Sequence, residues 1–138
     1  MTQLPPFFRY FEDVLNNEYR CIVREIDRTV ANIRLTSIPG IDKLHIPEKY
    51  YDSLYVADFN IIKAYRDFGV ESNLLQKAKS YSEKAKKPLV LSLEKLPFTG
   101  VPKIDLEEFM TFHGFRKIKK NSNYFFYRQT KQKNKGVV

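Results

Sequence analysis

The sequence predicts a mixed α/β (α+β) fold, in which a mainly antiparallel sheet contains one central parallel strand pair and is flanked by helices. Three observations predict it. Alternating apolar and polar residues over 18–38 indicate a hairpin. Two almost continuous apolar runs, residues 54–62 and 89–93, indicate strands buried on both faces. A helical pattern over residues 70–86 separates these runs, and strand, helix, strand in this order implies a right-handed parallel crossover.

The segment before the hairpin has helical spacing. Residues 7–15 follow a double proline and stop near a pair of asparagines. Its apolar side chains recur at intervals of three and four, at Phe7, Phe8, Phe11, Val14 and Leu15. This pattern predicts a short helix that covers part of the sheet.

The predicted hairpin turns near Asp27 and Arg28 and ends at Pro39-Gly40. Residues 41–52 predict a loop with a short helical turn. The strand over 54–62 leads through a loop that reaches Gly69 into the helix over 70–86, and Pro88 prevents the helix from continuing.

The C-terminal part begins with a loop over residues 95–102. Asp105 is predicted to cap a helix, with a carboxylate three residues later as in a capping box. This helix is predicted to bury Leu106, Phe109 and Phe112, and Gly114 stands where a left-handed residue ends a helix. Residues 115–120 and 124–128 predict a final hairpin.

The positive charge is concentrated at one end of the chain. The 138 residues include 24 Lys and Arg against 16 Asp and Glu, a formal net charge of +8. The last 23 residues contain no acidic side chain but hold eight basic ones: Arg116, Lys117, Lys119, Lys120, Arg128, Lys131, Lys133 and Lys135. A basic protein suggests nucleic acid, but a neutral body with a basic end suggests it less. We expect one domain over residues 1–128 and a basic tail over 129–138.

Several classes of protein are excluded. The single cysteine, Cys21, excludes an internal disulfide framework and a multi-cysteine zinc site. Two isolated histidines, His45 and His113, do not suggest a metal centre. No apolar run approaches the roughly 18–20 residues of a membrane span, and the N-terminus lacks the pattern of a signal peptide. The expectation is a cytoplasmic protein without a membrane partner.

Three segments resemble the GNAT superfamily of acyl-CoA-dependent N-acetyltransferases. Residues 57–66 are similar to the family's fourth strand and the turn after it. Arg66-Asp-Phe-Gly69-Val-Glu71 lies on the family's (Gln/Arg)-x-x-Gly-x-(Gly/Ala) phosphate loop. Residues 109–115 resemble the family's Phe-Tyr-x-x-x-Gly-Phe signature. The resemblance covers roughly residues 18–128.

The resemblance implies that acetyl-CoA is the co-substrate and that an amine is the acceptor. By position, Asn60, Ile61 and Ile62 would lie along the pantetheine arm. The phosphates would be held by the turn after the strand, that is by Arg66, Asp67, Phe68, Gly69, Val70, Glu71 and Ser72. Independently of the family, a glycine before a helix permits close approach of a ligand, and the free N–H groups of a helix start bind anions.

The sequence departs from the family's pattern at three places. Glu71 stands where the family has Gly or Ala, and its carboxylate suits the helix dipole but competes with a pyrophosphate unless it points outward. Met110 occupies the position of the tyrosine that often protonates the departing thiolate, and a thioether donates no proton. Only about 18 residues precede the hairpin, so the family's first strand and part of its acceptor wall are expected to be shortened or missing.

The base that would deprotonate the amine is not settled by the sequence. The family often places a carboxylate on the fourth strand, at a position that falls near Tyr55 here. Asp58 is the nearby carboxylate, and burial in an apolar strand would raise its pKa. A hydrogen-bonded strand residue is an equally good interpretation of Asp58, and positioning of the amine alone could support transfer.

Three functions remain open at this level. The leading one is acetyl transfer from acetyl-CoA to an amine by direct attack in a ternary complex. The second is a GNAT-like module that has lost catalysis, which Glu71 and Met110 favour. The third and weakest is nucleic-acid binding through residues 116–135, where four consecutive aromatic residues adjoin basic ones. A homodimer is a further partner that the family resemblance allows.

Overall fold

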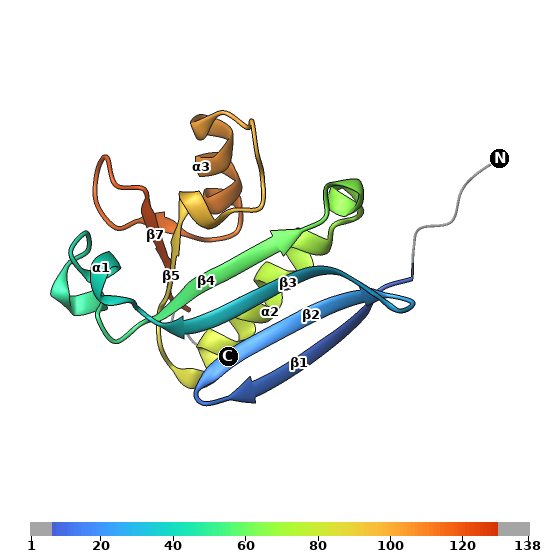
Figure 1. Cartoon of the computed structure of the whole chain (residues 1–138). Helices are drawn as coiled ribbons and strands as arrows, with labels where there is room; N and C mark the ends of the chain where they lie inside the picture. The colour runs from blue at the N-terminus through green and yellow to red at the C-terminus, as the bar shows by residue number, and fades with distance from the viewer. Residues whose placement is uncertain (1–6, 130–138) are drawn as a thin grey trace, which may run out of the picture.

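The computed structural model describes residues 7–129. Seven strands form one sheet in the order β1-β2-β3-β4-β5-β7-β6 (Figure 1). The strands are β1 (Arg9–Leu15), β2 (Glu18–Glu25), β3 (Arg28–Ser37), β4 (Leu54–Ile61), β5 (Leu89–Ser92), β6 (Arg116–Lys117) and β7 (Tyr124–Tyr127). The helices are α1 (Gly40–Lys43), α2 (Val70–Ala85) and α3 (Lys103–Phe112), with 3₁₀ turns η1 (Glu48–Tyr50), η2 (Lys63–Phe68) and η3 (Leu93–Lys95).

The strand pairing confirms the predicted fold class. Neighbouring strands are antiparallel except β4 and β5, which run parallel and are joined by α2. The hairpin of β2 and β3 turns at residues 26–27, one position earlier than predicted. Residues 41–52 contain two short helical turns, as the sequence indicated.

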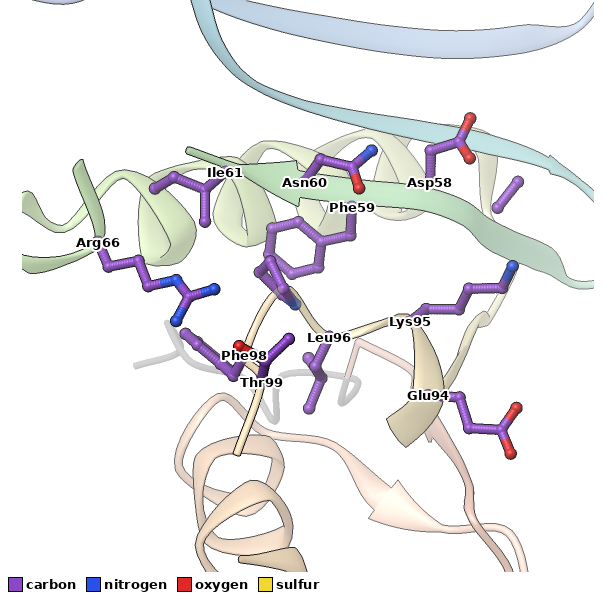
Figure 2. A pocket seen from close by; sticks show the side chains of 12 residues that line it. Asp58, Phe59, Asn60, Ile61, Arg66, Glu94, Lys95, Leu96, Phe98 and Thr99 are labelled. Atoms are coloured by element: carbon purple, nitrogen blue, oxygen red, sulfur yellow. The ribbon is translucent and has the colours of Figure 1, made fainter. Parts of the chain in front are cut away.

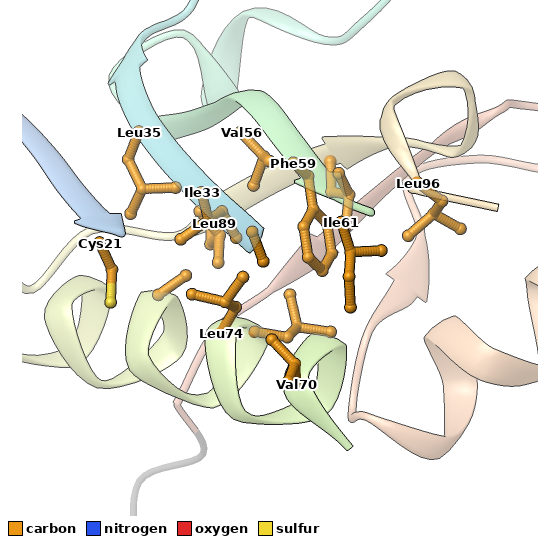
Figure 3. Packing of buried hydrophobic residues seen from close by; sticks show 14 of the residues in the cluster. Cys21, Ile33, Leu35, Val56, Phe59, Ile61, Val70, Leu74, Leu89 and Leu96 are labelled. Carbon is orange, nitrogen blue, oxygen red and sulfur yellow. The ribbon is translucent and has the colours of Figure 1, made fainter. Parts of the chain in front are cut away.

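Helix α2 covers one face of the sheet and makes the main core with it (Figures 1 and 3). Its buried stripe includes Val70, Leu74 and Leu75, which belong to the same cluster as Ile33 of β3 and Val56 of β4. Cys21 is fully buried in this cluster, as expected for a strand residue. A smaller cluster joins Ile46 and Tyr50 of the segment between β3 and β4 to Tyr55 of β4 and Val90 of β5.

The helix predicted for residues 7–15 is wrong, because this segment forms strand β1. Asn16 and Asn17 both have positive φ, 55° and 64°, which is the geometry of a two-residue hairpin turn that asparagine tolerates. The turn pairs β1 with β2 from Leu15↔Glu18 to Arg9↔Arg24. Most side chains of β1 are exposed, so a helix would bury little of this apolar stripe. Pairing with β2 therefore decides the structure of the segment.

The expected loss of the family's first strand is also wrong, since β1 takes the edge position of a complete seven-stranded sheet. The two helices that the family has before the hairpin are absent from the described residues, because a two-residue turn joins β1 to β2 directly. The sheet face opposite α2 is consequently uncovered over β1 and β2 (Figure 1).

The start and the buried face of α3 differ from the prediction. The helix begins at Lys103 with Pro102 as N-cap, so Asp105 lies in its first turn and caps nothing. A proline just outside a helix start has the φ that the helix needs, which makes the aspartate unnecessary there. Met110 is fully buried instead of Phe112, which is 84% exposed. Gly114 has φ +88°, which confirms the left-handed residue after the helix.

The terminal hairpin is shorter than predicted, with only two residues in β6. No helix within residues 7–129 is long and apolar enough to cross a membrane. The tail predicted for residues 129–138 lies outside the described residues except for Gln129.

Candidate functional site

A cavity of about 340 Å³ opens between the end of β4 and the segment after β5 (Figure 2). Residues 57–61 line one side and residues 94–99 the other, and we call it the β4–β5 cavity. Arg66 and Glu94 lie at opposite ends of it in Figure 2.

The cavity exists because β4 and β5 separate. They pair only at Leu54↔Leu89 and Tyr55↔Val90. Strand β5 then ends at Ser92 and turns into η3, whereas β4 continues to Ile61. The later part of β4 is therefore a strand edge without a neighbour on the β5 side among the described residues, and its N–H and C=O groups can pair with an extended ligand.

Of the three residues predicted to follow the pantetheine arm, the structure places two at the cavity. Asn60 and Ile61 line it. Ile62 lies beyond the end of β4 and donates its backbone N–H to Val30 O of the neighbouring strand at 2.8 Å. The ladder between β3 and β4 shifts at Arg34/Leu35, so Ala57 has no partner in β3 and also lines the cavity.

Of the predicted phosphate turn, Arg66 lines the cavity, whereas residues 67–72 do not. η2 ends at Gly69, whose φ of +78° lies in the left-handed region that favours glycine, and α2 begins at Val70. The first intrahelical bond runs from Asn73 N to Gly69 O. The N–H groups of residues 70–72 are thus the free donors that a helix start offers to an anion.

Side chains of this turn have separate roles. Arg66 reaches toward Phe98 in Figure 2, and its Nε is buried without a hydrogen-bond partner in the described part of the chain. Asp67 and Phe68 are exposed, and Val70 is core. Ser72 Oγ lies 3.3 Å from His113 Nε2 and so joins α2 to the end of α3.

Glu71 points inward, which settles the orientation that the sequence left open. Its side chain is 7% exposed, and its Oε1 has no hydrogen-bond partner among residues 7–129. Burial raises the pKa of Glu71 and nearby Asp67 adds to the rise, against the opposing effects of its own backbone N–H and of Arg66. An acidic side chain thus occupies the turn that would bind phosphate.

Asp58 is not the buried carboxylate that the sequence suggested. Its side chain is 42% exposed and accepts a hydrogen bond from Arg34 Nε at 2.6 Å. This bond raises the pKa of Arg34. In Figure 2 Asp58 points away from residues 94–99. The structure therefore places the carboxylate of Asp58 on Arg34 and not in the cavity.

Tyr55 takes part in a constellation that sequence reasoning missed. Its buried hydroxyl donates to Asp42 Oδ1 at 3.0 Å, and Tyr124 donates to the same oxygen at 2.7 Å. Burial, these bonds and the charge of Glu94 raise the pKa of both phenols. The partners come from α1, β4 and β7, so only the folded chain brings them together. Neither phenol is activated as a base.

Met110 lies in the core and not at the cavity, because its side chain is fully buried. His113 is the C-cap of α3, as its place before Gly114 indicated. Burial and then Lys79 lower the pKa of His113. The family's proton donor therefore has no side-chain counterpart at the Met110 position.

No protein-family model and no curated protein matches the sequence. Solved structures do match. The chain is similar to the Bacillus subtilis N-acetyltransferase YlbP, solved in complex with coenzyme A, at 18% identity and a TM-score of 0.55, with 80% of this chain and 67% of that one covered. A GNAT-family acetyltransferase from Staphylococcus aureus matches at 14% identity and a TM-score of 0.55, over 80% and 67% of the two chains.

Escherichia coli ElaA matches at 16% identity and a TM-score of 0.55, over 85% of this chain and 72% of that one. The chain thus spans about two thirds of the length of the first two structures. These matches show that the chain has the GNAT fold.

Proposed function

We propose that the protein transfers an acetyl group from acetyl-CoA to an amine by direct attack in a ternary complex. The observation that carries the proposal is the β4–β5 cavity, which has a free strand edge along it and, at one end, Arg66, four residues before the start of α2. The B. subtilis protein of the same fold is solved with coenzyme A, which supports the same class of ligand here.

In the proposed complex, the pantetheine arm pairs with the backbone of β4 at Asn60 and Ile61. Arg66 and the N–H groups of residues 70–72 hold the diphosphate, since a guanidinium and a helix start both favour anions. The thioester then lies toward the point where β4 and β5 separate, near Ala57. An N–H of the strand edge is a suitable donor for the carbonyl oxygen as negative charge develops on it.

The acceptor amine approaches from the end of the cavity that Glu94 flanks. Its nitrogen forms a bond to the carbonyl carbon, the carbon–sulfur bond breaks, and CoA leaves as a thiolate. Glu94 is exposed and lines the cavity, and no hydrogen bond to its carboxylate is found among the described residues. We assign to it, in place of Asp58, the proton that the ammonium loses before attack. The nitrogen loses its extra proton as the amide forms, and water carries this proton to the thiolate, because Met110 cannot donate one.

Binding is tested first. Acetyl-CoA should raise the melting temperature of the protein, because a ligand that binds only the folded state stabilises it. The absence of a shift at millimolar acetyl-CoA would overturn the proposal. Turnover is then followed as free CoA thiol with a panel of amines. Cys21 does not interfere in the assay, because burial raises the pKa of its thiol to about 11.

The catalytically degenerate module remains the second candidate, and the burial of Met110 favours it. It predicts the same thermal shift but no release of CoA thiol with any amine. The two functions are therefore separated by the turnover measurement alone.

A further inference from the structure

Glu71 occupies the turn in which a phosphate group would bind. It is the second residue of α2, directly after Gly69 and Val70. Its backbone N–H lies close enough to its own carboxylate to favour the charged form. This N–H is one of the free donors of the helix start, so the carboxylate already occupies a donor that an incoming anion needs.

The surroundings of Glu71 do not compensate its charge. The side chain is more than nine-tenths buried, and one of its oxygens has no hydrogen-bond partner in the described chain. From η2, Asp67 opposes the charge and Arg66 favours it. At the end of α3, His113 lies 3.3 Å from Ser72, the neighbour of Glu71, and burial lowers the pKa of His113. Burial is the largest of these effects.

Arg66 shows the same lack of a partner from the other side of the turn. Its Nε is also buried without a hydrogen bond among residues 7–129, although Glu71 is near enough to affect it electrostatically. An unpartnered cationic donor and an unpartnered anionic acceptor thus belong to one turn, and Arg66 lines the space at this end of the β4–β5 cavity. A diphosphate in that space satisfies Arg66 but repels a charged Glu71. A protonated Glu71 instead has an O–H that donates to a phosphate oxygen.

We propose that Glu71 determines when the phosphate turn accepts its ligand: the carboxylate and the diphosphate of CoA are alternative occupants, and CoA binds to the form in which Glu71 carries a proton. The inference rests on the proposed function, since it concerns the same site. Because CoA binds only the protonated form of Glu71, the affinity for CoA rises as pH falls, and binding is accompanied by the uptake of a proton at Glu71.

The test compares the wild type with Glu71→Gln, which keeps the shape and supplies a permanent donor. Titration calorimetry with CoA is carried out between pH 5.5 and 8.5, in buffers of different ionisation enthalpy, so that proton uptake is measured directly. At pH 7.5 Glu71→Gln should bind CoA about tenfold more tightly, a difference of about 1.4 kcal/mol, because the variant places no negative charge beside the diphosphate. The wild type should take up more protons than the variant, whose remaining pH dependence belongs to the ligand.

Glu108→Gln is the matched control, because Glu108 is an exposed carboxylate on α3 and its substitution removes the same charge. Equal affinities and equal proton uptake in the wild type and Glu71→Gln would overturn the inference and leave the proposed function intact. Failure of all three proteins to bind millimolar CoA at every pH would overturn the proposed function itself, and the inference with it. Binding by Glu71→Gln alone would support both.

Stability of the free protein gives an independent readout. Because the folded-state pKa of Glu71 is raised, the group contributes stability at low pH and loses it as pH rises through that pKa. Glu71→Gln should therefore melt at a higher temperature than the wild type at pH 7.5, and the difference should shrink as pH falls toward the ordinary glutamate value. A difference that does not change with pH would contradict the assignment of the effect to this titration.

Discussion

At the scale of single residues, Arg66 is the side chain that argues most directly for an anionic ligand. It lines the cavity, and its buried Nε has no partner in the described part of the chain. A hydrogen bond from a guanidinium to a charged acceptor contributes about 1.5–3 kcal/mol. We expect Arg66→Gln to raise the Kd for CoA at least about tenfold in titration calorimetry, whereas Arg116→Gln on β6 leaves it unchanged. Equal losses in both variants would indicate a general effect of net charge.

Two carboxylates at the cavity have opposite expected roles. Asp58 is paired with Arg34, while Glu94 is exposed and its carboxylate has no ion pair or hydrogen bond within residues 7–129. Glu94→Gln should lower kcat about a hundredfold or more, as the loss of a general base does, without changing the Kd for acetyl-CoA. Asp58→Asn should keep most of kcat and cost less than about 1 kcal/mol of stability, since the ion pair is partly exposed. The reverse pattern would restore Asp58 as the base.

At the scale of elements, the sequence predicted the part of the fold that holds the cavity. The apolar runs of β4 and β5 and the stripe of α2 are strong patterns, since burial on both strand faces and on one helix face leaves few alternatives. The position of Gly69 between them indicated the helix start correctly. The prediction was therefore best where local pattern and tertiary burial agree.

Elements that depend on a neighbour were predicted poorly. Strand β1 has exposed apolar side chains at spacings that also fit a helix, and only its pairing with β2 decides its structure. In α3 Met110 is buried and Phe112 is exposed, and only the packing of the helix against the rest of the fold decides which face is buried. The hydrogen bonds of Asp42 span up to 82 residues of sequence. No local sequence pattern predicts hydrogen bonds between residues so far apart.

The turn between η2 and α2 makes a prediction of its own. Gly69 has φ +78°, and no atom lies within 4 Å of the place where a Cβ would stand, so backbone conformation and not space requires glycine. Gly69→Ala should cost about 1 kcal/mol, and lower the melting temperature by a few degrees. Gly40→Ala also has room for its Cβ but has no positive φ, and should be neutral. Equal melting temperatures of the two variants would contradict this account of the turn.

At the scale of the whole molecule, the aromatic residues of β7 are used inside the protein. Tyr124 bonds to Asp42, Phe125 is buried, Phe126 packs on Tyr50, and Tyr127 bonds to Glu83. Bases stack on aromatic faces that are free to receive them. Strand β7 therefore offers little to a nucleic acid, and the basic residues beyond it are the remaining argument for such a partner.

The charge distribution leads to a prediction for the intact chain. Residues 1–115 carry as many acidic as basic side chains, and Lys131, Lys133 and Lys135 lie in the predicted tail. If the domain carries the function, a chain that ends at Gln129 should keep both the melting temperature and the Kd for CoA.

Nucleic-acid binding, measured by fluorescence anisotropy with single-stranded RNA, should be weak at physiological salt in both chains, because few cationic contacts yield little affinity once counterions compete. Tight RNA binding by the full chain that disappears on truncation would instead assign the basic end a partner of its own. Loss of CoA binding on truncation would show that the domain that binds CoA extends beyond residue 129.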